Sequence, residues 1–232
     1  MRLAEQVLDA RPTPAQRVAA LFTKAQARQQ AGDIEGAVRF AREAVQLRDD
    51  EAGRQFLASM LIRSKDRAEG LQIMRRMLQE SPRDTGLMNN LGYALVDSHQ
   101  SAEELDEGFR LLKEASRLAP DEPNLLDSLG WAYFQYGDFE QARRFVELAV
   151  ENYLPFRNWE LEDHMGDILW RTGDPAGAKA RWRAALEQRP PANDARRIEA
   201  KTREGLTTPA PAPRAPPDVP LGERRETGSS EI

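Results

Sequence analysis

The sequence predicts an all-α fold, a solenoid built from helical hairpins, on two observations. Amphipathic runs repeatedly end at a proline: Pro12, Pro82, Pro120 and Pro190. Three glycines within apolar runs, Gly92, Gly130 and Gly166, recur roughly 36 residues apart, a period typical of helical repeat proteins. Because one hairpin buries its apolar face only against its neighbours, this period predicts a stack of about five hairpins.

The repeated units lie near residues 18–50, 51–84, 85–122, 123–158 and 159–192. In the last two, small residues recur at the same intervals: Gly130, Gly137, Ala142 and Ala149, then Gly166, Gly173, Ala178 and Ala185. Small side chains allow the two helices of a hairpin to approach closely, and Gly137 and Gly173 suit the left-handed residue that ends a first helix. We expect Asp138 and Asp174 to cap the second helices by accepting backbone N–H bonds.

The first three units follow this pattern more loosely. The third carries about four extra residues around Asp97–Ser101. The second has Lys65 and Asp66 where glycine-aspartate is expected, and the first keeps Gly32 and Asp33 but lacks a closing proline. Five units in register nevertheless predict a continuous array.

Segments on either side of the repeats complete the predicted organisation. Residues 1–14 hold an orphan second helix, at 3–10, whose first helix is missing, so we expect the chain to be the C-terminal part of a longer array. Residues 15–192 hold the five hairpins, 193–206 form a polar C-terminal capping helix, and 207–232 form a proline-rich tail. We expect that tail to be disordered and removable without harm.

This pattern resembles the tetratricopeptide repeat over most of residues 15–192. The resemblance implies a right-handed superhelix in which the first helix of each hairpin lines a concave groove. It also implies that the signature residues hold hairpins together and carry no chemistry. The stretches 126–132 and 164–170 look like the C-terminal array of proteobacterial cell-envelope tetratricopeptide proteins, some of which deliver proteases or cell-wall enzymes to their substrates.

Composition restricts the partners and the compartment. The chain has 232 residues, is 40% hydrophobic and 31% charged, and carries a net charge of −5. That charge argues against a nucleic-acid surface, which needs a basic face. There is no cysteine, no apolar run of about 18 residues and no signal peptide at the start. We expect a soluble protein without direct membrane insertion, cytoplasmic as written, or periplasmic if the N-terminus is truncated.

Motifs for catalysis are missing from the sequence. It contains no phosphate-binding loop, nucleophile elbow, dinucleotide fingerprint or zinc-protease motif. Of the two histidines, His164 could face Asp167 on a helix, but two ligands make a poor metal site. We therefore expect no enzyme activity, no cofactor and no metal, and a surface or packing role for His164.

The resemblance places a partner-binding groove on the first helices of the last three hairpins. Its expected residues are Asn89, Tyr93, Asp97, Asn124, Asp127, Trp131, Phe134, Glu160, Asp163, Asp167 and Trp170. Amides can bond a peptide backbone, aromatic rings offer apolar area, and carboxylates attract basic side chains. The sequence thus predicts a scaffold or adaptor that binds a protein or peptide segment with basic and apolar residues.

Alternatives remain open at this point. Trp131, Phe134 and Trp170 could only pack between hairpins, and the acidic groups could be ordinary solvated surface. The chain could be the regulatory or substrate-recruiting arm of a larger envelope enzyme or glycosyltransferase system. A helical RNA-binding repeat is a further alternative, which the net charge of −5 and the acidic groove disfavour.

Overall fold

The computed structural model describes residues 13–218, which contain eleven α-helices and no β-strand. The helices are α2 (Pro14–Gln30), α3 (Ile34–Leu47), α4 (Glu51–Ile62), α5 (Arg67–Glu80), α6 (Thr85–Asp97), α7 (Ala102–Leu118), α8 (Pro123–Gln135), α9 (Phe139–Tyr153), α10 (Trp159–Arg171), α11 (Pro175–Glu187) and α12 (Ala192–Glu204). No helix in this range is both long and apolar enough to cross a membrane. The predicted all-α fold is confirmed, whereas the expected helix at 3–10 lies outside the described residues.

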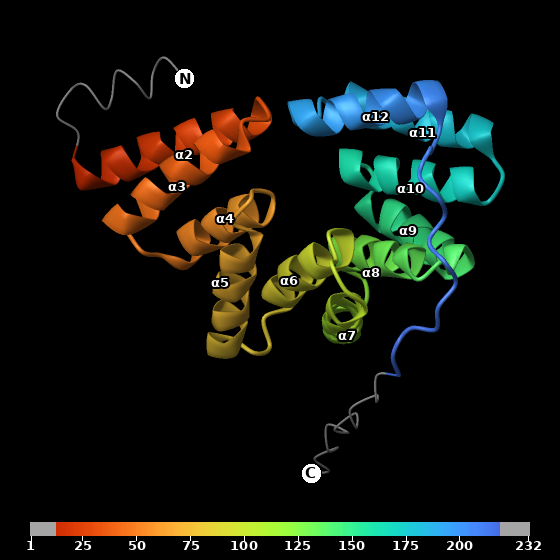
Figure 1. Cartoon of the computed structure of the whole chain (residues 1–232), viewed down its shortest axis with the longest axis horizontal. Coiled ribbons are helices and arrows are strands. Elements are labelled where there is room, and N and C mark those ends of the chain that lie inside the picture. Colours follow the sequence, from red (N-terminus) through yellow and green to blue (C-terminus); the bar gives the residue numbers. More distant parts are fainter. Residues whose placement is uncertain (1–12, 219–232) are drawn as a thin grey trace, which may run out of the picture.

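Ten of the helices pair into five hairpins, α2–α3, α4–α5, α6–α7, α8–α9 and α10–α11, as Figure 1 shows. The second helix of each hairpin also packs against the first helix of the next one. The last helix, α12, packs on α11 in the same way and takes the place of a sixth first helix. The predicted solenoid of about five hairpins is therefore confirmed.

Local signals in the sequence explain where the second helices begin. Asp138 accepts a hydrogen bond from the Gln141 amide at 3.1 Å, and Asp174 accepts one from the Gly177 amide at 2.9 Å. Each bond satisfies a backbone donor that the first turn of a helix leaves free. Gly137 just before the cap has a φ of 73°, a conformation that costs glycine little.

The largest apolar cluster runs through the last three hairpins and into α12. Trp182 on α11 is fully buried in it and lies directly over Gly166 on α10. A Cβ atom at position 166 would lie 2.4 Å from Trp182 Nε1, so only glycine allows this approach. Gly166 thus makes room for the indole of Trp182, and the interior stays closely packed.

The two ends of the described array meet each other (Figure 1). Gln30 Nε2, at the end of α2, donates to the Arg189 carbonyl at 3.2 Å, and the Gly32 carbonyl, in the turn that follows, accepts from Asn193 Nδ2 at 3.0 Å. Arg63, after α4, forms an ion pair of 2.9 Å with Asp194 on α12. The curved stack therefore closes into a ring through polar contacts.

The proline-rich segment follows α12 along the outside of the array (Figure 1). From Gly205 to Asp218 it has no helix or strand, yet it hydrogen-bonds to α7, to α10 and to Tyr136 directly after α8. The sequence predicts extended backbone here, and the structure agrees. It differs from the expected disorder for 207–218, because Arg171 and Asp106 bind this stretch.

Candidate partner-binding site

The eleven predicted groove residues all lie on first helices. Those on α6 are Asn89, Tyr93 and Asp97, those on α8 are Asn124, Asp127, Trp131 and Phe134, and those on α10 are Glu160, Asp163, Asp167 and Trp170. Most of the α8 and α10 members are buried, and several bind one another or α12.

His164 and Asp127 form a buried charged pair between α10 and α8. His164 Nδ1 lies 2.9 Å from Oδ1 and 3.0 Å from Oδ2 of Asp127. On its other side, His164 Nε2 lies 3.3 Å from the Tyr93 hydroxyl on α6. Burial lowers the pKa of His164, but Asp127 outweighs it and raises the pKa to about 9, so the ring is cationic at neutral pH. Through its two ring nitrogens, His164 thus connects α10 to α8 and to α6.

Trp131 is stacked between two rings. The His164 ring lies 4.2 Å away on one side and the Phe134 ring 4.7 Å away on the other, both nearly parallel to the indole. The indole Nε1 donates to Asp97 at 3.0 Å. Trp131 is 7% exposed and Phe134 5%, and a cationic ring over an indole adds an electrostatic attraction. Both aromatic side chains therefore pack between hairpins.

The acidic residues of α10 are bound by the basic residues of α12. Lys201 Nζ lies 3.0 Å from Asp163 Oδ1 and 2.7 Å from Asp167 Oδ2, and all three residues are buried. Arg197 adds a contact of 2.8 Å to Asp163, and Trp182 Nε1 donates to Asp167 at 2.9 Å. Burial alone would raise the pKa of Asp163, but Lys201 and Arg197 hold it below its usual value.

Trp170 lies where the chain leaves α12. Its ring is 5.7 Å from that of Trp182, and a Cβ atom at Gly205 would lie 2.1 Å from its Cζ2 atom. Gly205, with a φ of 79°, therefore places the backbone directly on the indole. The chain itself covers this predicted anchor.

The remaining four predicted residues are Asn89, Asp97, Asn124 and Glu160. Asp97 and Asn124 are exposed, whereas the Oδ1 atom of Asn89 is buried and accepts no hydrogen bond from residues 13–218. Glu160 is half-buried, and its carboxylate forms no ion pair within the described part of the chain. Burial raises the pKa of Glu160; nearby His164 opposes the rise, whereas Asp127 adds to it.

Charged groups from several helices influence the pKa of Glu160. Besides His164 and Asp127, they include Asp194 on α12 and Arg63 at the end of α4. Charged groups from three hairpins and the capping helix therefore act on the pKa of one carboxylate. We use the name inner face for four positions on the first helices, those of Asn89, Asp97, Asn124 and Glu160.

Three residues that take part in these buried charge pairs were not identified from the sequence. His164 was expected at the surface or in simple packing, and Lys201 and Arg197 were given no part. The signal that could have identified them is spacing, because His164 lies 37 residues from Asp127 and Lys201 lies 38 from Asp163, about one repeat. Among the described residues no group of three His, Cys, Asp or Glu side chains is arranged to hold a metal ion.

Comparisons of the sequence with known proteins find tetratricopeptide repeats. The family model for the tetratricopeptide repeat matches residues 124–147 and 164–184. The TPR repeat-containing protein PA4667 of Pseudomonas aeruginosa is 29% identical over 113 residues, which are 48% of this chain and 18% of that protein. The chain thus spans less than a fifth of this curated relative's length.

One solved structure shares the architecture of the array. The crystal structure of TTC0263, a thermophilic TPR protein of Thermus thermophilus, superimposes with a TM-score of 0.66 at 18% identity, covering 82% of this chain and all of that one. MamA from Desulfovibrio magneticus RS-1 gives a TM-score of 0.48 at 18% identity over 73% of this chain and 93% of that one. The repeated sequence, the stacked hairpins and these matches support a tetratricopeptide repeat protein.

Proposed function

We propose that this protein is an interaction scaffold that binds a basic segment of a partner protein on the inner face, beside Glu160. The tetratricopeptide fold supports the general role of protein–protein interaction. The location of the site and the basic character of the partner are our proposal, and they rest on the charge pairing described above.

The observation that carries the proposal is the contrast between Glu160 and its neighbours. Asp127 is neutralised by His164, and Asp167 by Lys201, within the chain. Glu160 lacks such an ion pair among residues 13–218, and its pKa is raised because burial disfavours its charge. An incoming lysine or arginine would supply the missing opposite charge and add specificity to the contact.

The predicted groove residues then divide into two sets by environment. We assign the partner contacts to the inner face, Asn89, Asp97, Asn124 and Glu160. We assign the assembly of the array to Tyr93, Asp127, Trp131, Phe134, Asp163, Asp167 and Trp170. Amides on the inner face would bond the backbone of the bound segment.

The test is capture of partners by the tagged full chain, followed by affinity measurements. Replacing Glu160→Gln together with Asn89→Ala should weaken binding of the captured partner at least tenfold without changing the melting temperature. Glu140→Gln is the matched control, because Glu140 is an exposed glutamate in the first turn of a second helix. Equal affinity of the double variant and the control would refute the inner face as the site.

A further inference from the structure

The proline-rich segment after α12 contacts three hairpins in succession on the outside of the array. Residues 205–218 pass the C-terminal ends of α10 and α8 and then reach α7. The prolines favour an extended polyproline conformation, which loses little entropy on binding. The contacts below are made by side chains and backbone that lie outside the inner face.

The first contact is at Arg171, the last residue of α10. Its guanidinium donates to the Thr208 carbonyl at 2.6 Å and to the Pro209 carbonyl at 3.2 Å. Hydrogen bonds from a charged donor are stronger than those between neutral groups. Arg171 therefore recognises mainly the backbone of the segment, with one longer contact of 3.4 Å to the Thr208 hydroxyl.

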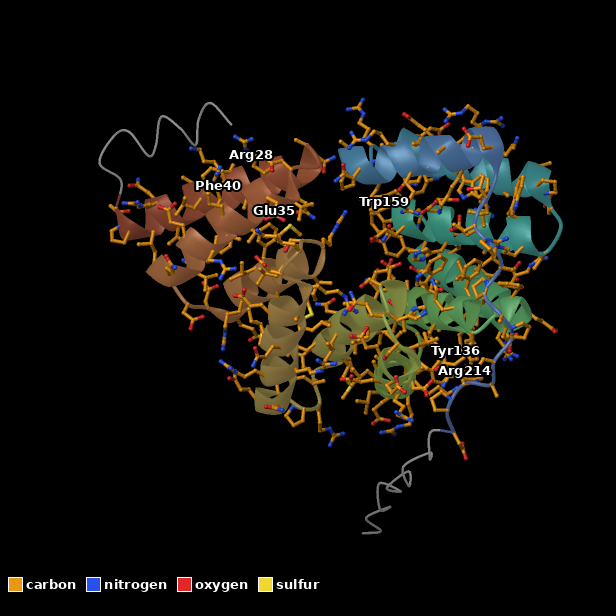
Figure 2. The ribbon with its side chains drawn as sticks, viewed as in Figure 1. Arg28, Glu35, Phe40, Tyr136, Trp159 and Arg214 are labelled. Carbon is orange, nitrogen blue, oxygen red and sulfur yellow. The ribbon has the colours of Figure 1, made fainter. Side chains whose placement is uncertain are left out.

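The second contact is an arginine site made by Asp106 and Tyr136. Arg214 Nη2 lies 2.6 Å from Asp106 Oδ2, and its guanidinium lies 5.5 Å from the centre of the Tyr136 ring. The Arg214 amide donates to the Tyr136 carbonyl at 2.9 Å. Figure 2 shows Tyr136 and Arg214 together where the segment passes α8. A carboxylate, a ring face and a carbonyl thus bind one residue.

The receptor side of this arginine site is fixed by the fold. Tyr136 is 1% exposed and its hydroxyl donates to the Asp106 carboxylate, joining α8 to α7. Burial would raise the pKa of Asp106, but the bonds from Tyr136 and Arg214 lower it, so the carboxylate stays charged. A buried tyrosine that orients a partly exposed carboxylate is a preorganised arginine receptor.

Between the two contacts the prolines pass over a turn without a side chain. A Cβ atom at Gly137 would lie 2.8 Å from the Pro211 carbonyl oxygen and 3.0 Å from Pro213 Cα. Gly137 is needed for its positive φ as well, so the same residue ends α8 and admits the segment. Proline lacks a backbone N–H, so this close approach leaves no donor unpaired.

We propose that Asp106, Tyr136, Gly137 and Arg171 form a second binding site, for an extended proline-rich segment that carries an arginine, and that residues 207–214 occupy it in cis. A partner segment of the same chemistry binds there when the chain's own segment is released. The tether holds the cis segment at an effective concentration in the millimolar range, so release controls access to the site. This site is independent of the inner face.

The first experiment measures release in the full chain. Because the chain has no cysteine, Asp218→Cys provides a single position for a fluorescent label. Arg214→Ala and Asp106→Asn should each lower the anisotropy of the label, whereas the control Asp121→Asn, an exposed carboxylate in the turn before α8, should leave it unchanged. Equal anisotropy in all four proteins would overturn the proposal.

The second experiment supplies the segment in trans, as a labelled synthetic peptide of residues 207–218. It should bind the full-length Arg214→Ala chain at least tenfold more tightly than the wild-type chain, where the cis segment competes. Replacing the peptide's own arginine by alanine, or combining Arg214→Ala with Asp106→Asn in the chain, should abolish binding. No binding to the Arg214→Ala chain, or equal binding to a scrambled peptide, would contradict the site.

Discussion

Lys201 Nζ lies 2.7 Å from both carboxylate oxygens of Asp167, with both side chains buried between α10 and α12. The capping helix α12 therefore does more than cover apolar surface, because its lysine neutralises acidic charge on α10. Removing one member of such a pair leaves a buried charge without compensation.

The stability of the array should depend on Lys201. We expect Lys201→Met to lower the free energy of unfolding by about 3–5 kcal/mol, measured by urea denaturation. The control Lys65→Met, in an exposed turn, should change it by less than about 0.5 kcal/mol. Adding Asp167→Asn to Lys201→Met should restore part of the loss, and a loss that stayed the same would count against the pairing.

Stability should also depend on pH through His164. Its pKa is raised from 6.5 to about 9 in the folded chain, so the folded state binds the proton more tightly than the unfolded state. The resulting stabilisation, on the order of 3 kcal/mol, is fully present below pH 6.5 and is lost as the pH rises through 9. Urea denaturation between pH 6 and 10 measures it, and His164→Gln should remove this component. An unchanged profile in that variant would show that another group titrates.

Trp131 should behave as a core residue. We expect Trp131→Ala to cost about 3–5 kcal/mol of unfolding free energy, because it empties the space between His164 and Phe134. Trp131→Phe should cost less, since it keeps a ring but loses the bond to Asp97. If Trp131→Ala instead kept the wild-type melting temperature and weakened partner binding about thirtyfold, the tryptophan would be a binding anchor.

The closed ring should open when two of its three polar contacts are removed. Arg63→Ala with Asn193→Ala deletes the ion pair to Asp194 and the bond to the Gly32 carbonyl. We expect a larger radius of gyration in small-angle X-ray scattering and a loss of less than about 1 kcal/mol in unfolding free energy, because the contacts are partly solvated. Arg17→Ala, which breaks an exposed pair within the first hairpin, should leave the radius unchanged.

The sequence predicted well those features that depend on neighbouring residues. Hairpin count, caps such as Asp138 and the close approach at Gly166 follow from spacing within one unit. The prediction was weaker where distant helices determine the environment. Whether an acid on a first helix faces solvent depends on its partner one repeat away, as Lys201 shows for Asp163.

The proline-rich tail illustrates the same limit. Its composition predicts extended backbone, which the structure has at 207–218, but composition holds no information on a receptor. That receptor is the pair Asp106 and Tyr136, which lie 30 residues apart and meet only in the folded array. A tail expected to be removable thus contributes Arg214 to a specific contact.

The most direct test of the proposed function is a charge exchange at Glu160 with a captured partner. Glu160→Lys should weaken the partner's affinity at least tenfold, and reversing one basic residue of the bound segment to glutamate should restore it. Glu140→Lys, on a second helix, should have no effect on affinity. If Glu160→Lys binds the wild-type partner as tightly as the unaltered chain does, the inner face is not the binding site.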